Sequence, residues 1–499
     1  MVRRQWSRRA RWLTAVAAAV LIAGPLGYFW GTSFVPSTYS VMDMGYPDLG
    51  GGQPDMTNMA GMTGMPPGVS VASLTGPATG APNVAVTLVA RKEKFRLASG
   101  QTIDGFTLNH VSPGPTIRAA QGDVLQVTLV NASVPAGVTL HWHGVDVPNA
   151  DDGVAGVTQN AVPVGGSFVY KFRLTDAGTY WYHSHQDSLA EVSGGLFGAL
   201  IVKPRASGHA APTPVETTVT FHTYGKLATI NGRTGLQRVD AEPGSAERVR
   251  IIDTDMQPLG VTVSGTTYRV ISHDGRDINQ PTDLDQTAVL IPAGGRVDLS
   301  VTVPMSNSAA LVDLGNGAEL AIGPAGSTVA PEPAADGQLD FSSYGSPAPI
   351  GFDPTHPDRR FDYRISRHIG FENGKPGDWW TVDGHRFPDV PMFEVTEGDV
   401  VVMTISNSSS LHPMHLHGHH AVVLSRNGVP TTGSPWWFDS LDVETGSTYV
   451  IAFVADNPGI WMDHCHNLQH AADGLLAHLA YTGVTEPYVI GGASRNNPE

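Results

Sequence analysis

The amino-acid sequence predicts an all-β protein with three consecutive β-sandwich or Greek-key barrel domains. Glycine and proline account for 57 and 37 of the 499 residues, whereas charged residues make up only 15%. This composition favours many short strands and turns over long helices. After residue 80 the apolar residues show no sustained helical periodicity, and one sequence unit recurs three times. Such recurrence is typical of repeated structural units.

The first 30 residues predict an export segment. An apolar run from Trp12 to Trp30 follows five arginines: Arg3, Arg4, Arg8, Arg9 and Arg11. A positive segment before an apolar one is typical of a secretory signal, and the run is also close to the roughly 20 residues that span a bilayer. We therefore expect a cleaved signal peptide or a membrane anchor, with the rest of the chain outside the cytoplasm, secreted or tethered to the outer face of the membrane. Ser7-Arg8-Arg9 resembles the start of a twin-arginine signal.

Residues 31–80 are rich in Gly, Pro, Ser, Thr and Met, and this composition predicts a disordered linker. Four methionines recur at every third position: Met56, Met59, Met62 and Met65. Thioethers are soft ligands that select Cu(I), so these residues are candidates for an auxiliary Cu(I) site. The alternative is a spacer whose methionines bind nothing.

The three copies of the repeated unit define the expected domains at residues 81–206, 213–345 and 350–490. Their register is set by three matching segments, each followed 13 to 15 residues later by a turn glycine: Thr107-Leu108-Asn109, Thr229-Ile230-Asn231 and Thr381-Val382-Asp383. The first and third copies agree best, because residues 122–131 and 398–407 both read Gly-Asp-Val, then β-branched and apolar residues, then Asn. Each segment predicts a strand between turns.

Charge and cysteine content exclude several classes of protein. The formal net charge of −16 argues against nucleic-acid binding, which needs clustered Lys and Arg. The sequence has one cysteine, Cys465, so an intramolecular disulfide and a Cys-rich zinc or iron–sulfur site are excluded.

Ten of the 20 histidines fall into four clusters, two in the first copy and two in the third: His141 and His143; His183 and His185; His412, His415 and His417; His464, His466 and His470. On a strand, side chains at positions i and i+2 share a face, so His464 and His466 should face away from Cys465. His412 lies an odd three positions before His415 and can point elsewhere. Two metal sites on opposite sides of one strand are therefore expected.

The donor types indicate which metal each site binds. His412, Cys465 and His470 offer one thiolate and two imidazoles, the ligand set of a blue-copper electron-transfer centre. The eight histidines of the paired motifs suffice for a multinuclear copper cluster and exceed the four ligands of a structural zinc site.

With these motifs in this order, the chain resembles the three-domain multicopper oxidases, the laccase-like family, over roughly residues 85–485. The resemblance implies cupredoxin-like domains, with no copper ligands in the second, and four copper ions per chain. It implies His412, Cys465 and His470 at the type 1 copper, and His141 with His415 at the type 2 copper. For the two type 3 coppers it implies His143, His183 and His466 on one, and His185, His417 and His464 on the other.

The resemblance also implies an activity. Phenols or aromatic amines would give single electrons to the type 1 copper, and the electrons would pass through Cys465, His464 and His466 to the trinuclear cluster. There O₂ would be reduced to water with four electrons. Asp151-Asp152-Gly153 resembles the family's Asp-Gly element, so Asp152 is the candidate for proton delivery; the alternative is a turn carboxylate.

The sequence departs from the family pattern at several positions. Leu475 stands where many bacterial members carry an axial methionine, so a high type 1 potential is expected. Some members place a carboxylate three or six residues after the cysteine, where Leu468 and Ala471 stand here, and Asp473 is a weak substitute. His419 and His420 are expected to be solvent-exposed or to support neighbouring ligands.

Three alternatives remain open. A cuprous oxidase serving copper tolerance would use the same ligands together with the methionines. A nitrite-reducing copper enzyme is disfavoured, because Cys465 stands between two histidines. A non-enzymatic copper-binding protein would be expected to have lost ligands, and none is missing here.

Overall fold

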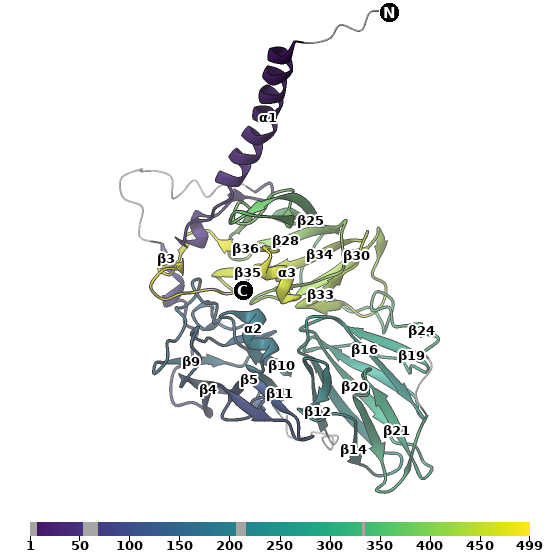
Figure 1. Ribbon diagram of the computed structural model, residues 1–499. Coiled ribbons are helices and arrows are strands. Elements are labelled where there is room, and N and C mark those ends of the chain that lie inside the picture. Colours follow the sequence, from purple (N-terminus) through teal and green to yellow (C-terminus); the bar gives the residue numbers. More distant parts are fainter. Residues whose placement is uncertain (1–6, 53–67, 206–215, 332–334) are drawn as a thin grey trace, which may run out of the picture.

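The computed structural model describes residues 7–52, 68–205, 216–331 and 335–499 (Figure 1). Apart from an N-terminal helix and short helical turns, the regular elements of these residues are strands, which confirms the predicted all-β fold class. The strands fall into a first region (residues 84–203), a middle region (residues 216–338) and a last region (residues 359–491). The division into domains with the predicted boundaries remains a prediction.

The first region contains two sheets of order β5-β4-β7-β9 and β6-β11-β10-β8. Its elements are β4 (Val84–Arg96), β5 (Thr102–Leu108), β6 (Ile117–Ala120), β7 (Val124–Asn131), β8 (His141–His143), η3 (Asn149–Asp151), β9 (Ser167–Arg173), β10 (Gly178–His183), α2 (Ser188–Ser193) and β11 (Phe197–Lys203). Strand β7 buries Leu125, Val127 and Leu129 at alternate positions, as expected for a strand with one face on the core.

The middle region also pairs its strands in two sheets, of order β13-β12-β15-β20-β17-β18 and β14-β22-β21-β16-β19-β24, with β23 beside β21. Its strands are β12 (Glu216–Tyr224), β13 (Leu227–Ile230), β14 (Leu236–Asp240), β15 (Ala246–Asp253), β16 (Leu259–Ser264), β17 (Tyr268–His273), β18 (Arg276–Asp277), β19 (Thr287–Ile291), β20 (Arg296–Thr302), β21 (Ser308–Asp313), β22 (Glu319–Gly323), β23 (Thr328–Val329) and β24 (Gly337–Gln338).

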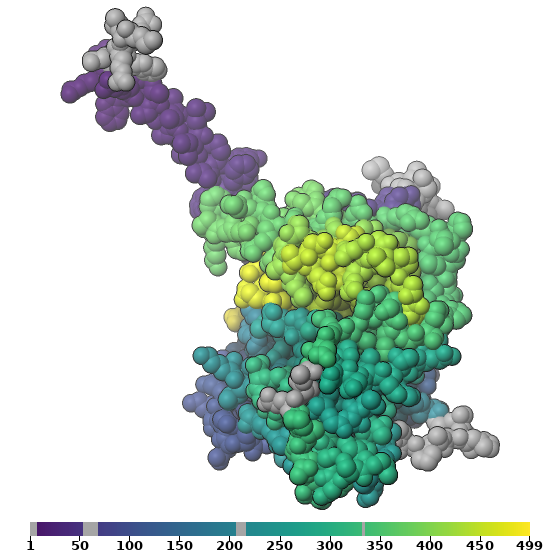
Figure 2. Space-filling model, turned by 90° about the vertical axis from the view of Figure 1, so that its right-hand side faces the viewer, coloured from purple at the N-terminus to yellow at the C-terminus, as the bar shows by residue number. Residues whose placement is uncertain are grey.

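The last region has sheets of order β2-β27-β36-β35-β29-β33 and β26-β25-β28-β34-β30-β31, with β32 beside β30 and with β2 (Tyr46–Asp48) joining from the segment that precedes the first region. Its elements are β25 (Arg359–Glu372), β26 (Lys375–Val382), β27 (Pro391–Val395), β28 (Val400–Asn407), β29 (His412–Leu416), β30 (Ala421–Arg426), β31 (Val429–Pro430), β32 (Trp436–Phe438), β33 (Ser440–Val443), β34 (Thr448–Val454), β35 (Ile460–Cys465), α3 (Leu468–Ala472), β36 (Leu476–Tyr481), β37 (Val484–Thr485) and β38 (Ile490–Gly491). In Figures 1 and 2 this region, green to yellow, is stacked on the teal middle region.

The three regions share one hairpin arrangement, which explains the repeated sequence unit. In each, a long strand pairs antiparallel with the next strand and parallel with the strand that follows the turn glycine: β4 with β5 and β7, β12 with β13 and β15, β25 with β26 and β28. The second strand ends before Asn109, Asn231 or Asp383, each at a positive φ near 50° that Asn and Asp tolerate. Each of these side chains accepts a hydrogen bond from a backbone N–H of the long strand, at 2.7–3.1 Å. The repeat therefore encodes a turn and its cap.

The prediction of a disordered linker is wrong for residues 31–52 and 68–80. Strands β1 (Thr38–Tyr39), β2 (Tyr46–Asp48) and β3 (Val69–Ser70) pair with β38, β27 and β37, and the turns η1 (Val41–Asp43) and η2 (Val71–Ser73) bury Val41 and Val71. A few apolar side chains fix this segment because the last region supplies the partner strands, which average composition does not reveal. Met56, Met59, Met62 and Met65 lie outside the described residues.

Helix α1 (Arg8–Gly31) projects from the last region and buries none of its residues (Figure 2). It is long and apolar enough to cross a membrane. Its base is tied to the turn between β25 and β26, where the Val35 N–H donates to Oδ1 of Asn373 at 3.0 Å and the Gly374 N–H donates to Oγ of Ser33 at 3.1 Å. The helix thus leaves the body at a defined place. Arg3 and Arg4 lie outside the described residues.

Candidate metal centres

The lone thiol lies between two imidazoles. Sγ of Cys465, at the end of β35, is 3.6 Å from Nδ1 of His412 at the start of β29 and 3.6 Å from Nδ1 of His470 in α3. The two Nδ1 atoms lie 3.1 Å apart. These three donor atoms therefore converge on one point, as the ligands of a single small metal ion do.

The surroundings of this thiol suit a bound metal. Burial raises the pKa of Cys465 well above its usual value, and burial together with His470 lowers the pKa of His412 to about 3. The metal-free site thus holds a neutral thiol and neutral imidazoles, and a cation is needed to stabilise the thiolate. Trp380 packs against both imidazoles with ring centroids 4.6 Å away. His470 is the donor that remains partly exposed, so the site reaches solvent on its side.

The positions around α3 provide apolar side chains in place of donors. Leu475 is fully buried, and its carbonyl accepts a hydrogen bond from the Cys465 N–H at 3.1 Å. Leu468 and Ala471 are buried too. Asp473, the expected substitute carboxylate, accepts a hydrogen bond from the exposed Gln469 at 3.1 Å. The Asp473 carboxylate is therefore bound by a surface side chain.

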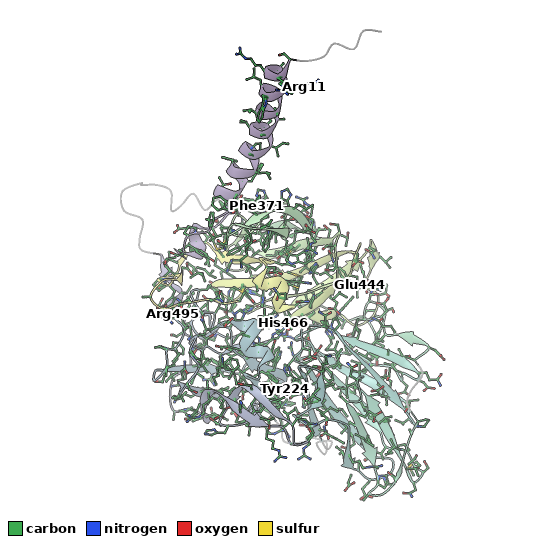
Figure 3. The ribbon with its side chains drawn as sticks, in the orientation of Figure 1. Arg11, Tyr224, Phe371, Glu444, His466 and Arg495 are labelled. Atoms are coloured by element: carbon green, nitrogen blue, oxygen red, sulfur yellow. The ribbon has the colours of Figure 1, made fainter. Side chains whose placement is uncertain are left out.

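The eight histidines of the paired motifs meet in one buried cluster between the first and last regions (Figure 3, where His466 marks its position). In the first region, His141 and His143 lie on β8 and His183 ends β10, with His185 two residues beyond it. In the last region, His415 and His464 lie within β29 and β35, and His417 and His466 directly follow those strands. Cross-strand pairing sets His415 opposite His464. Across the seam, Nε2 of His141 lies 3.3 Å from Nε2 of His415; within the last region, Nε2 of His417 lies 3.2 Å from Nε2 of His464.

The donor atoms form overlapping groups. All donors lie within 4.8 Å of one another in three histidine sets: His141, His143 and His183; His141, His415 and His417; His185, His417 and His464. His466 lies beside His143 and His183, with ring centroids 4.9 and 5.5 Å away. The cluster can therefore hold more than one metal ion.

The protonation state and the free nitrogen atoms of this cluster fit copper. Burial, reinforced by neighbouring imidazoles, lowers the pKa of His143, His183, His415, His417 and His466 well below the usual value, and burial lowers that of His185 and His464 to about 3. Neutral imidazole is the form that binds metal. Nε2 of His183 and both ring nitrogens of His185 and His466 have no hydrogen-bond partner among the described residues. A bound metal ion would supply the partner that these buried ring nitrogens lack among the described residues.

Asp152 links histidines from two regions. Its Oδ1 lies 3.0 Å from Nδ1 of His141, and its Oδ2 lies 3.1 Å from Nδ1 of His417. The carboxylate is completely buried and contacts the Nδ1 atom of each ring. The Nε2 atoms of His141 and His417 therefore remain free to face a metal. The Asp152 side chain thus contacts two histidines of the cluster, which a carboxylate that only caps a turn would not do.

A second buried carboxylate, Asp439, belongs to no sequence motif that would have revealed it. Its Oδ1 lies 3.1 Å from Nε2 of His143, which leaves Nδ1 of that ring unpaired, and its backbone carbonyl lies 2.7 Å from Nδ1 of His415. Arg296 donates to both carboxylate oxygens at 2.5 Å. Asp274 accepts from the Arg296 backbone N–H at 2.8 Å.

The middle region therefore supports the cluster without supplying one of the predicted ligands. Gly294 adopts φ +82°, and a Cβ there would lie 2.7 Å from Cε1 of His143. The turn before β20 thus packs directly against the histidines, and only glycine fits that close approach.

His419 and His420 are not solvent-exposed, and that part of their prediction is wrong. Nδ1 of His419 lies 3.0 Å from the His417 carbonyl, and Nε2 of His420 lies 3.2 Å from the Asp274 carbonyl. Both are buried because the three regions meet beside β29. They contact the residues that hold the cluster.

Comparisons with known proteins agree with this arrangement. Two family models, both described as multicopper oxidase, match residues 90–207 and 360–483. The chain is 27% identical to multicopper oxidase MmcO of Mycobacterium tuberculosis, covering 85% of this chain and 92% of that protein, and 25% identical to Laccase-1 of Botryotinia fuckeliana, covering 76% and 78%.

Among solved structures, the multi-copper oxidase from Pseudomonas thermotolerans superposes with a TM-score of 0.65 at 25% identity, covering 80% of this chain and 99% of that one. The structural similarity, the donor geometry, the all-β fold and the matched family models therefore all point to the same family. The chain belongs to the multicopper oxidases and is a copper-binding oxidoreductase of the laccase-like type.

Proposed function

We propose that this protein couples the one-electron oxidation of phenols and aromatic amines to the four-electron reduction of O₂ to water. The observation that carries the proposal is the position of Cys465. Its sulfur belongs to one donor set, while its bonded neighbours His464 and His466 belong to the other. One short peptide thus joins a substrate-oxidising centre to an O₂-reducing centre.

The proposed ligands follow the convergence of donors. His412, Cys465 and His470 would hold the type 1 copper, and His141 with His415 the type 2 copper. The type 3 pair would be held by His143, His183 and His466 on one ion and by His185, His417 and His464 on the other, giving four copper ions per chain. The short Nε2 separations within the cluster support this division.

Bound copper would supply the single-electron transfers and the reduction of O₂. The chain's own residues do the rest. His470 is partly exposed and provides the edge nearest to a reducing substrate. Trp380 and Leu475 keep water from the buried thiolate side. Asp152 holds the two imidazoles that it contacts, and its carboxylate is placed to pass a proton towards them.

Phenols and aromatic amines are proposed because relatives of this chain are named laccases. The acidic chain, with a net charge of −16, favours neutral or cationic substrates. The relatives do not favour the alternative of a cuprous oxidase. Its distinguishing residues, Met56, Met59, Met62 and Met65, lie outside the described residues.

We propose further that α1 remains as an anchor on the outer face of the cytoplasmic membrane. The residues after the helix are held by the hydrogen bonds of Ser33 and Val35 with Asn373 and Gly374, so the helix base is part of the folded body. Mass spectrometry of the mature protein from membrane and soluble fractions tests this. A mature chain that starts beyond Ser33 would contradict the proposal.

Oxygen uptake by the copper-loaded protein tests the main proposal, with a phenol, an aromatic amine and Cu(I) as reductants. We expect turnover with the first two and a ratio of four electrons per O₂. A variant lacking residues 53–67 should keep this activity, and its Cu(I) oxidation should match that of the full chain. Failure of every reductant with four bound coppers would refute the oxidase function; loss of Cu(I) oxidation alone in the deletion variant would support the cuprous oxidase.

A further inference from the structure

A buried carboxylate that the motifs do not reveal lies beside the histidine cluster. Oε1 of Glu499 is 3.0 Å from Nδ1 of His464, and the Glu499 side chain is only 6% exposed. Neither oxygen of this carboxylate has a hydrogen-bond partner among the described residues. A carboxylate in such a place needs a nearby positive charge to offset its desolvation.

The segment Arg495–Glu499, here called the strap, is fixed before it reaches His464. The Asn497 N–H donates to Oε1 of Gln186 at 2.9 Å, the Asp187 N–H donates to the Asn497 carbonyl at 2.7 Å, and Oγ of Ser188 donates to the Pro498 carbonyl at 2.5 Å. These partners directly follow His185 of the first region. Figure 3 places Arg495 at the rim of the molecule, left of His466. The strap therefore runs inward across the seam between the first and last regions.

The strap supplies a carboxylate on the side where α3 provides none. Ala471 and Glu499 line the same cavity of about 450 Å³, together with His478 and Met462. Leu468 and Ala471 are buried and apolar. Glu499 thus brings an acidic group to this side of the cluster from a distant part of the sequence.

The ring orientation of His464 gives the carboxylate a specific task. Nε2 of His464 faces Nε2 of His417 at 3.2 Å, so Nε2 is the nitrogen available to a metal and Nδ1 must carry the ring proton. A carboxylate beside Nδ1 stabilises that tautomer and holds the ring in place.

We propose that Glu499 is a positioning residue for the type 3 copper pair. Its carboxylate holds His464 with Nε2 directed at the metal, and its negative charge stabilises the copper bound by His185, His417 and His464. This inference rests on the proposed assignment of these histidines as copper ligands. The strap ties the two regions that supply them.

Copper binding by Glu499→Gln tests the inference, because glutamine keeps the size of the side chain and removes its charge. We expect copper affinity at the type 3 pair to fall 10- to 100-fold in chelator competition. The blue absorption of the Cys465 site should remain, while electron paramagnetic resonance should show the loss of the coupled pair. Glu486→Gln is the matched control, since Glu486 is a partly buried carboxylate that accepts hydrogen bonds from Oγ of Ser40 and from the Val41 N–H, and neither of these contacts involves the cluster. It should bind copper like the wild type.

Two further variants keep the test decisive. Glu499→Asp retains the charge and should bind copper more tightly than Glu499→Gln. His464→Ala should lose the type 3 signature outright; if it keeps the signature, the ligand assignment fails, independently of substrate turnover. The inference is overturned if Glu499→Gln binds four coppers with wild-type affinity, or if Glu499→Gln and Glu486→Gln lose copper to the same extent.

Discussion

The two donor sets differ in how many parts of the chain they require. His412, Cys465 and His470 all come from the last region, and one of them is partly exposed. The eight clustered histidines come from two regions, are buried, and depend on carboxylates and an arginine contributed by all three. Changes at the thiol site should therefore act locally, whereas changes around the histidine cluster should also affect how the regions fit together.

The largest difference in effect between the two donor sets is expected for Cys465→Ser. Without the thiolate, the blue absorption and substrate oxidation should be abolished. The histidine cluster lies on the other side of β35 and should keep its copper, measured by copper content and electron paramagnetic resonance. Substrate turnover by the serine variant would contradict the proposed electron path.

Removing the metal should make stability depend on pH. The folded pKa of His185, His412 and His464 lies at about 3, below the unfolded value of 6.5. Between these values the unfolded chain binds more protons, so stability is complete above pH 6.5 and is lost as the pH falls towards 3, by an amount on the order of several kcal/mol. Denaturant unfolding of metal-free protein between pH 7 and pH 4 measures this, and a flat profile would contradict it. Copper should not flatten the profile, because the unfolded chain still takes up protons that metal-bound imidazoles cannot.

Arg296→Met tests the support from the middle region. It leaves Asp439 buried without its cation, so the free energy of unfolding of the metal-free protein should fall by about 3–5 kcal/mol. Arg367→Met is the control near the thiol site. Arg367 and Asp378 are both nearly half exposed, and their separation should cost about 0–1 kcal/mol. Equal losses of unfolding free energy in the two variants would show that the histidine cluster depends no more on support from the middle region than the thiol site does on its surface ion pair.

Asp152→Asn should lower turnover about 10- to 100-fold while leaving the blue absorption unchanged. The amide keeps the shape but removes the charge and the proton acceptor between His141 and His417. Asp151→Asn is the neighbouring control, because the Asp151 carboxylate accepts a hydrogen bond from the Lys171 N–H. Wild-type turnover in Asp152→Asn would rule out its role in proton delivery.

Leu475→Met should have the smallest effect. A thioether beside the type 1 copper would stabilise Cu(II) relative to Cu(I) and lower the reduction potential, with the histidine cluster unaffected. Redox titration of the blue absorption measures the change. An unchanged or raised potential would show that the side chain at position 475 does not set it.

The sequence alone predicted the all-β class and the histidine clusters, because strand parity and short motifs are local. Parity also predicted that His412 could point away from His415, and the structure places His412 against Cys465. These relations hold within one strand and do not depend on how the regions dock.

Asp439, Arg296 and Glu499 could not be predicted in the same way. Each is a single polar residue outside any motif, and each meets the cluster only after distant segments have packed. The same reason explains the incorrect linker prediction, since β1, β2 and β3 find their partner strands only in the distant last region. Residues that contact the site in space but lie far from it in the sequence form no motif by which they could be recognised.

The peptide that contains Cys465 has a consequence for heating. His464, Cys465 and His466 are joined by covalent bonds, so the separation of the two centres cannot change when the regions move apart. The geometry of the histidine cluster can change, because side-chain contacts between two regions, His141 with His415 and His183 with His466, contribute to it. Warming should therefore abolish O₂ reduction before it abolishes electron transfer to the type 1 copper. At such a temperature a reducing substrate should still bleach the blue colour, and air should no longer restore it.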